Sequence, residues 1–95
     1  PKIFFAYGFG NSCTFPFAAG ATAVLHPGRP DAESVYHVIE RHRPTVLFGL
    51  PTLYNALIAH PRSESRDLRS LRLCLSAAEV LSGDVFREWQ RRTGL

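Results

Sequence analysis

This sequence contains residues that could bind a metal or act in catalysis, but few of them have the spacing that these roles need. Four histidines, His26, His37, His42 and His60, are candidate metal ligands. None of them stands at ligand spacing from a cysteine or a carboxylate, so structural or surface roles fit them better. The sequence also lacks a G-x-S-x-G segment that would activate a serine, and a glycine-rich loop spaced to hold phosphate. Neither a metal centre nor a covalent nucleophile is predicted.

One stretch, "LSAAEVLSG" (residues 75–83), has the composition of a binding loop. An apolar run leads into the small residues Ala77 and Ala78 and then into the carboxylate of Glu79. Small side chains at the end of a strand let a flat ring approach the backbone. Tight packing between strand and loop explains the same pattern equally well.

A second stretch, "FFAYGFGNS" (residues 4–12), places Tyr7 between the small residues Ala6 and Gly8. Tyrosine offers an aromatic wall with a polar tip, and the small neighbours keep the space beside the ring open. Taken alone, Tyr7 could equally be a core aromatic residue next to a turn.

The elements that position these stretches are predicted to be strands of a parallel sheet. Short apolar runs at Thr22–His26 and Thr45–Gly49 predict covered strands, and alternation from Leu71 predicts a third. Lys2–Phe5 can also be extended. Since ligands bind at the carboxyl ends of parallel strands, the two stretches are expected to converge there on one flat slot.

Helices are predicted between and after these strands. Asp31 and Ser82 can act as N-caps, and Pro51 is well placed as the first residue of a helix. Gly94 can close the last helix. The alternation of strand and helix predicts an α/β fold with a parallel sheet.

Composition and charge exclude several classes of partner. The net charge is +3, but arginines alternate with acidic residues, so no basic stripe for nucleic acid is predicted. No apolar run approaches the roughly 20 residues of a membrane span. Cys13 and Cys74 are far apart in sequence and are predicted to be buried free thiols, which favours the reducing cytoplasm.

Three segments together resemble a known family. "FFAYGFGNSCTFPFAAGATAVL", "RPTVLFGLPTLYNAL" and "LRLCLSAAEVL" are similar to the middle of the large N-terminal domain of adenylate-forming (AMP-binding) acyl-CoA ligases. The similarity is greatest to benzoate-CoA and 4-hydroxybenzoate-CoA ligases and covers essentially all of residues 1–95. It implies an internal piece of an adenylation domain, with ATP, Mg²⁺ and coenzyme A used by the longer parent protein.

The resemblance also implies roles for residues. Part of the aromatic acid pocket would be formed by Ala6, Tyr7, Gly8, Ala77 and Ala78, and part of the adenine pocket by Ala78, Glu79 and Val80. Relatives usually have glycine where this sequence has Ala78, and the added methyl group is expected to affect substrate preference.

The resemblance places the main catalytic parts elsewhere. The phosphate loop should precede these residues, and the ribose-binding aspartate and catalytic lysine should follow them. No catalytic residue is therefore assigned here, the isolated piece is expected to be inactive, and no oligomeric state is predicted.

Two other classes stay open at the level of sequence. A fatty-acyl or amino-acid-activating relative is one, although the aspartate expected near residues 6–8 of an amino-acid-activating domain is absent. A non-enzymatic α/β interaction module of natural length is the other.

Overall fold

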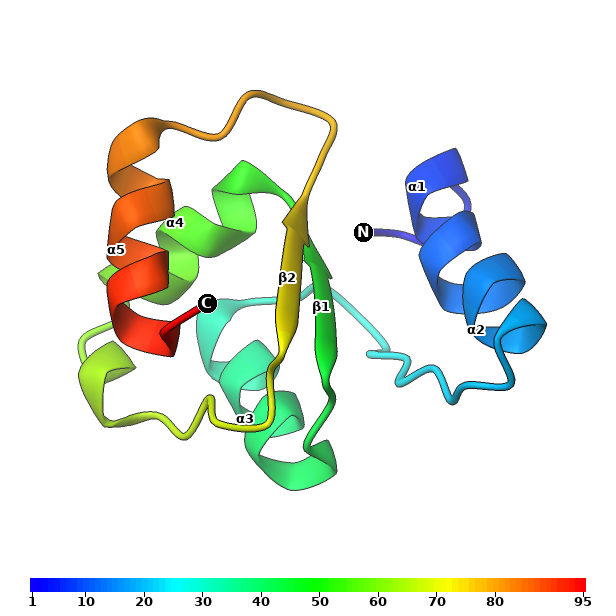
Figure 1. The fold of residues 1–95 in the computed structure, drawn as a ribbon, viewed down its shortest axis with the longest axis horizontal. Coiled ribbons are helices and arrows are strands. Elements are labelled where there is room, and N and C mark those ends of the chain that lie inside the picture. The colour runs from blue at the N-terminus through cyan, green and yellow to red at the C-terminus, as the bar shows by residue number, and fades with distance from the viewer.

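The sheet at the centre of the molecule contains two parallel strands. The structure, a computed structural model, describes all of residues 1–95. Strand β1 (Val46–Gly49) pairs with β2 (Leu73–Ser76) in a register that runs from Val46 opposite Leu73 to Gly49 opposite Ser76. Both strands therefore end at the same edge of the sheet (Figure 1). The predicted α/β class with a parallel sheet is confirmed.

Helix α3 (Ala32–His42) precedes β1 and is bounded as the sequence predicts. The carboxylate of Asp31 accepts a hydrogen bond from the Ser34 amide at 2.8 Å, and the Asp31 amide donates to the Ser34 hydroxyl at 3.2 Å. This reciprocal capping box satisfies two backbone donors at the start of the helix. The helix ends at Arg43, which has a left-handed backbone (φ 52°) directly before Pro44.

Two further helices follow the strands. Helix α4 (Pro51–Ala59) begins at a proline, whose fixed φ and missing amide hydrogen suit the first helical position. Helix α5 (Gly83–Thr93) is capped by Ser82 and ends at Gly94, which has a φ of 73° that glycine adopts without strain. A short 3-10 turn, η2 (Ser63–Ser65), lies in the connection from α4 to β2.

The hydrophobic core lies between these helices and one face of the sheet. Two tyrosines anchor it. The Tyr36 hydroxyl donates to the carbonyl of Leu57 at 2.6 Å, and the Tyr54 ring meets the Trp89 ring edge-on with centroids 5.1 Å apart. The buried apolar residues of this cluster are Val35, Tyr36, Ile39, Tyr54, Leu57, Leu68, Leu71 and Trp89.

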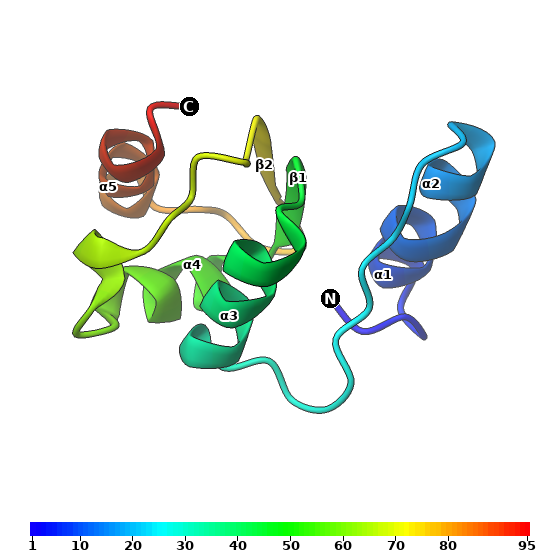
Figure 2. The same cartoon turned by 90° about the horizontal axis from the view of Figure 1, so that it is seen from below.

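The N-terminal segment is helical and lies on the other side of the strands from α4 and α5 (Figures 1 and 2). It consists of α1 (Ala6–Phe9), a π-helical turn η1 (Gly10–Thr14) and α2 (Phe15–Ala18), which follow one another without a break. Glycine is required at residue 8, because a Cβ atom there would lie 1.9 Å from the carbonyl oxygen of Lys2. The preceding turn therefore packs directly against α1.

Two predicted strands are corrected by the structure. Lys2–Phe5 forms a turn, closed by a 3.1 Å hydrogen bond from the Phe5 amide to the Lys2 carbonyl. Thr22–His26 has no regular structure, and Val24 and Leu25 in this run are 42% and 63% exposed. A strand needs a partner for its backbone donors and acceptors, and the apolar pattern alone does not supply one.

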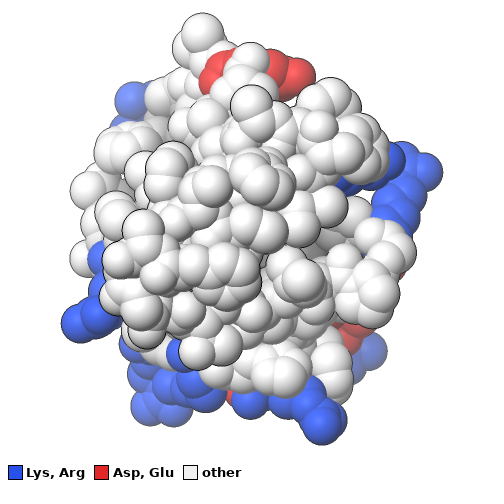
Figure 3. Space-filling view, turned by 90° about the vertical axis from the view of Figure 1, so that its right-hand side faces the viewer, with Lys and Arg blue, Asp and Glu red and all other residues white.

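The face that carries the N-terminal segment bears almost no charge (Figure 3). Five phenylalanine residues on it are more than half exposed, which is far from the usual state of phenylalanine. These residues are Phe4, Phe5, Phe9, Phe15 and Phe17. Uncharged surfaces with large apolar side chains normally contact another part of a protein or a partner.

Two smaller points concern the cysteines and the helix lengths. Cys13 and Cys74 are free thiols as predicted, but both are only partly buried. No helix is both long enough and apolar enough to cross a membrane.

Candidate functional site

The carbonyl of Gly49 joins the two stretches that the sequence singled out. At the carboxyl end of β1, this oxygen accepts a hydrogen bond from the Tyr7 hydroxyl at 3.3 Å and one from the Ala77 amide at 3.4 Å. Tyr7 comes from α1 on one side of the sheet, and Ala77 is the first residue after β2. Residues 70 positions apart in sequence therefore meet at one backbone atom.

The Tyr7 side chain is held against β1 at this strand edge. Its ring stands edge-on to Phe48 of β1, with the centroids 6.2 Å apart and an interplanar angle of 77°. Partial burial raises the pKa of the Tyr7 hydroxyl above its usual value, since the charged phenolate is poorly solvated there. The hydroxyl therefore stays protonated and can act as a donor to Gly49 throughout the physiological pH range.

The loop after β2 leads away from this contact into solvent. Ala78 has a left-handed backbone with φ 74°, one of only two such non-glycine residues in the chain. Glu79 makes no ion pair or side-chain hydrogen bond, and Val80 is 94% exposed. The loop thus turns sharply at Ala78 and presents side chains that have no partner within the chain.

The two small residues beside Tyr7, Ala6 and Gly8, have different surroundings. Ala6 is exposed at the first position of α1, so its methyl group leaves the surface beside Tyr7 uncrowded. Gly8 is buried, and the space beyond its Cα is filled by the Lys2 carbonyl. The absence of a side chain at Gly8 thus makes room for the N-terminal turn.

Two residues of this arrangement were missed by sequence reasoning. Gly49 was assigned only as the end of a strand, and Tyr54 was given no role in the site. Tyr54 is 2% exposed, and its hydroxyl lies 2.8 Å from the carbonyl of Leu75 and 3.4 Å from that of Leu47. A glycine at the end of a strand, two residues before a helix, was the available signal.

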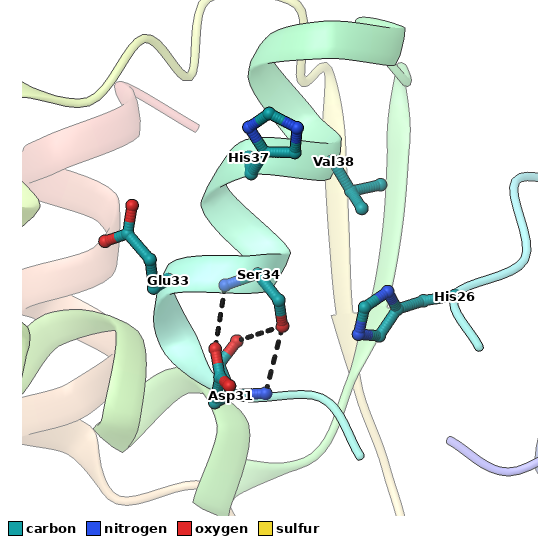
Figure 4. A pocket seen from close by; sticks show the side chains of 6 residues that line it. All are labelled: His26, Asp31, Glu33, Ser34, His37 and Val38. Atoms are coloured by element: carbon teal, nitrogen blue, oxygen red, sulfur yellow. Dashed lines mark hydrogen bonds between the residues drawn. The ribbon is translucent and has the colours of Figure 1, made fainter. Parts of the chain in front are cut away.

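A polar hollow beside the start of α3 is the main alternative site, and Figure 4 shows its residues. His26 faces the helix from a separate segment, while Asp31 and Ser34 are hydrogen-bonded to each other in the capping box. No group of three or more His, Cys, Asp or Glu residues in the chain is arranged to hold a metal ion. Capping of the helix accounts for the positions of Asp31 and Ser34. The lining residues are His26, Asp31, Glu33, Ser34, His37 and Val38.

Comparison with protein families gives a match over the whole chain. The model of the AMP-binding enzymes matches residues 1–95. A 4-hydroxybenzoate-CoA/benzoate-CoA ligase of Rhodopseudomonas palustris is 50% identical over 94 residues, which are 98% of this chain and 17% of that protein. A benzoate-CoA ligase of Thauera aromatica is 47% identical over 99% of this chain and 18% of its own length.

Solved structures that resemble this chain include ligases of the same kind. A crystal structure of an anthranilate-CoA ligase in complex with anthranoyl-AMP superposes with a TM-score of 0.95 at 40% identity, over 99% of this chain and 18% of that one. A benzoate-CoA ligase from Burkholderia xenovorans gives a TM-score of 0.90 at 39% identity, over 98% and 19%. The chain spans less than a fifth of the length of these proteins.

Proposed function

Because this chain belongs to the AMP-binding enzyme family, we propose that it is the central part of the adenylation domain of an ATP-dependent aryl-CoA ligase. The complete protein would join an aromatic carboxylate to ATP, releasing pyrophosphate and forming an acyl-adenylate. It would then transfer the acyl group to the thiol of coenzyme A and release AMP. The similar proteins include ligases for benzoate, hydroxybenzoate and anthranilate, which supports this substrate class.

One observation carries the proposal at the level of the residues. The Tyr7 hydroxyl and the Ala77 amide donate hydrogen bonds to the same Gly49 carbonyl, which supports a site formed between Tyr7 and the loop that begins at Ala77. An aromatic wall facing a loop of small residues forms a slot suited to a flat ring. In this proposal Tyr7 lines one side, Ala77 and Ala78 line the other, and Ala6 and Gly8 flank the tyrosine.

The nucleotide would lie on the far side of the same loop. Ala78, Glu79 and Val80 would contact the adenine, and the exposure of Val80 together with the unpaired carboxylate of Glu79 leaves both free to do so. The chain offers no cluster of ligands for Mg²⁺. We therefore expect magnesium to reach the site bound to the phosphates of ATP and to residues of the longer protein.

The uncharged face with its exposed phenylalanines supports the proposal that these residues are part of a larger domain. Five exposed phenylalanines on and beside α1–α2 would be covered by other parts of the longer protein. Residues 1–95 would then be an internal portion of a cytoplasmic enzyme, with its phosphate-binding and catalytic residues contributed by the remaining chain.

The experiment uses the longer protein that contains this chain. Pyrophosphate release would be measured with benzoate, with 4-hydroxybenzoate and with a medium-chain fatty acid, each in the presence of MgATP. We expect release with the aromatic acids and little with the fatty acid. Release that depends only on the fatty acid would assign the chain to a fatty-acyl relative, and no acid-dependent release at all would refute the adenylating activity.

A further inference from the structure

Beyond the residues proposed to line the slot, the structure indicates what holds the slot in shape. The Gly49 carbonyl is shared by both walls, so the position of this one peptide sets the distance between them. Gly49 is buried and stands at the last position of β1. Any group that fixes the end of β1 relative to the end of β2 therefore fixes the slot.

Tyr54 is the side chain that fixes the end of β1 relative to the end of β2, and it does so from the hydrophobic core. A Cβ atom at Gly49 would lie 2.7 Å from Cε2 and 2.9 Å from Cζ of the Tyr54 ring. These distances are shorter than carbon atoms tolerate, so the ring packs directly against the Gly49 backbone. The close approach requires glycine at residue 49.

The Tyr54 hydroxyl reaches both strands at once. It donates to the Leu75 carbonyl of β2 at 2.8 Å and lies 3.4 Å from the Leu47 carbonyl of β1. A buried hydroxyl that bridges neighbouring strands fixes their relative position, because leaving it without a partner would cost free energy. Trp89 of α5 packs edge-on against the same ring and restricts its orientation.

We propose that Tyr54 and Gly49 are positioning residues for the aromatic acid, acting through the shared Gly49 carbonyl on Tyr7 and Ala77. Neither residue contacts the substrate in this account. Tyr54 is a core residue of α4, the helix that lies across the strands from α1 (Figure 2), and it acts by setting the width of the slot. This inference rests on the proposed function.

The chain contains a matched control for the test. Tyr36 is also a fully buried tyrosine of the same core, and its hydroxyl also donates to a backbone carbonyl, that of Leu57 at 2.6 Å. Tyr36→Phe removes the same chemical group from the same cluster. The affected carbonyl, however, belongs to α4 and not to the strands that carry the slot.

The experiment compares Tyr54→Phe with Tyr36→Phe in the longer protein, by steady-state kinetics with benzoate and with ATP as the varied substrate. Loss of one buried hydrogen bond is expected to lower the melting temperature of both variants. We expect Tyr54→Phe alone to raise the KM for benzoate, by about fivefold, with the KM for ATP unchanged.

Failure of the proposed function and failure of this inference give different results. If the unaltered protein shows no acid-dependent pyrophosphate release, the proposed function is refuted and with it the inference. If it is active but Tyr54→Phe and Tyr36→Phe have equal effects on the KM for benzoate, Tyr54 has only a structural role and the inference alone is overturned. Gly49→Ala serves as a second variant, and we expect it to raise the KM for benzoate more than Tyr54→Phe does.

Discussion

The left-handed backbone of Ala78 leads to a prediction in which two neighbouring alanines respond in opposite ways to the same substitution. Ala78 has φ 74°, whereas Ala77 is not among the residues with positive φ. In the left-handed region a Cβ atom approaches the following carbonyl oxygen, which costs about 1–2 kcal/mol. Replacing Ala78 by glycine removes this cost.

The net effect is smaller than the strain, because glycine also gives the unfolded chain more freedom. That freedom costs about 0.5–1 kcal/mol on folding. Ala78→Gly should therefore stabilise the domain by about 0.5–1 kcal/mol. Ala77→Gly relieves no strain and should destabilise it by about the same amount.

The assay is thermal unfolding of the longer protein carrying each substitution, followed by calorimetry. We expect the midpoint of Ala78→Gly to rise by about 1–2 °C and that of Ala77→Gly to fall. A fall for both variants would refute the argument, since it would show that residue 78 gains nothing from the freedom of glycine. A second measurement concerns the slot: without the methyl group of Ala78, we expect kcat/KM for ring-substituted benzoates to rise relative to that for benzoate.

Three further predictions concern Tyr7, Glu88 and Asp31. Tyr7→Ala should remove aromatic packing of about 1 kcal/mol and raise the KM for the acid more than that for ATP in steady-state kinetics; equal changes would indicate a structural role. Arg91 and Arg92 lower the pKa of Glu88 from 4.5 to about 2, so its stabilising effect is present above pH 4.5 and is lost as the pH falls toward 2. Melting temperatures measured across this range should therefore fall more steeply for the unaltered protein than for Glu88→Gln. Asp31→Ala removes the capping box of α3 and should cost about 1 kcal/mol in the free energy of unfolding, as measured in urea; an unchanged midpoint would contradict this role.

Elements whose determinants are local could be predicted from the sequence. Asp31 and Ser82 cap the helices that they were expected to cap, and Pro51 opens α4. These signals act within one helical turn, so they are readable without knowledge of the tertiary structure. Strands were expected at Thr45–Gly49 and from Leu71, and the structure has them at Val46–Gly49 and Leu73–Ser76, which pair directly with each other.

The predictions of secondary structure that were wrong concern segments whose conformation depends on distant contacts. Thr22–His26 has the composition of a covered strand, yet no backbone of this chain pairs with it. The N-terminal segment forms a helix in spite of Gly8 and Gly10, and the Lys2 carbonyl packs where a Cβ atom of residue 8 would lie. Neither the missing partner nor the packed carbonyl has a signature in the local sequence.

In the candidate site too, the side-chain patterns could be predicted from the sequence and the backbone contact that joins them could not. Tyr7 and Ala77 stood out because an aromatic residue among small ones, and small residues after a strand, are patterns of side chains. The atom that joins them is the backbone oxygen of Gly49, which every residue type possesses and which no side-chain pattern marks. Glycine is needed there for a different reason, the Tyr54 ring packed 2.7 Å from where a Cβ atom would stand. A substitution at residue 49 would thus disturb the proposed acid-binding slot through Tyr54, a side chain of the hydrophobic core.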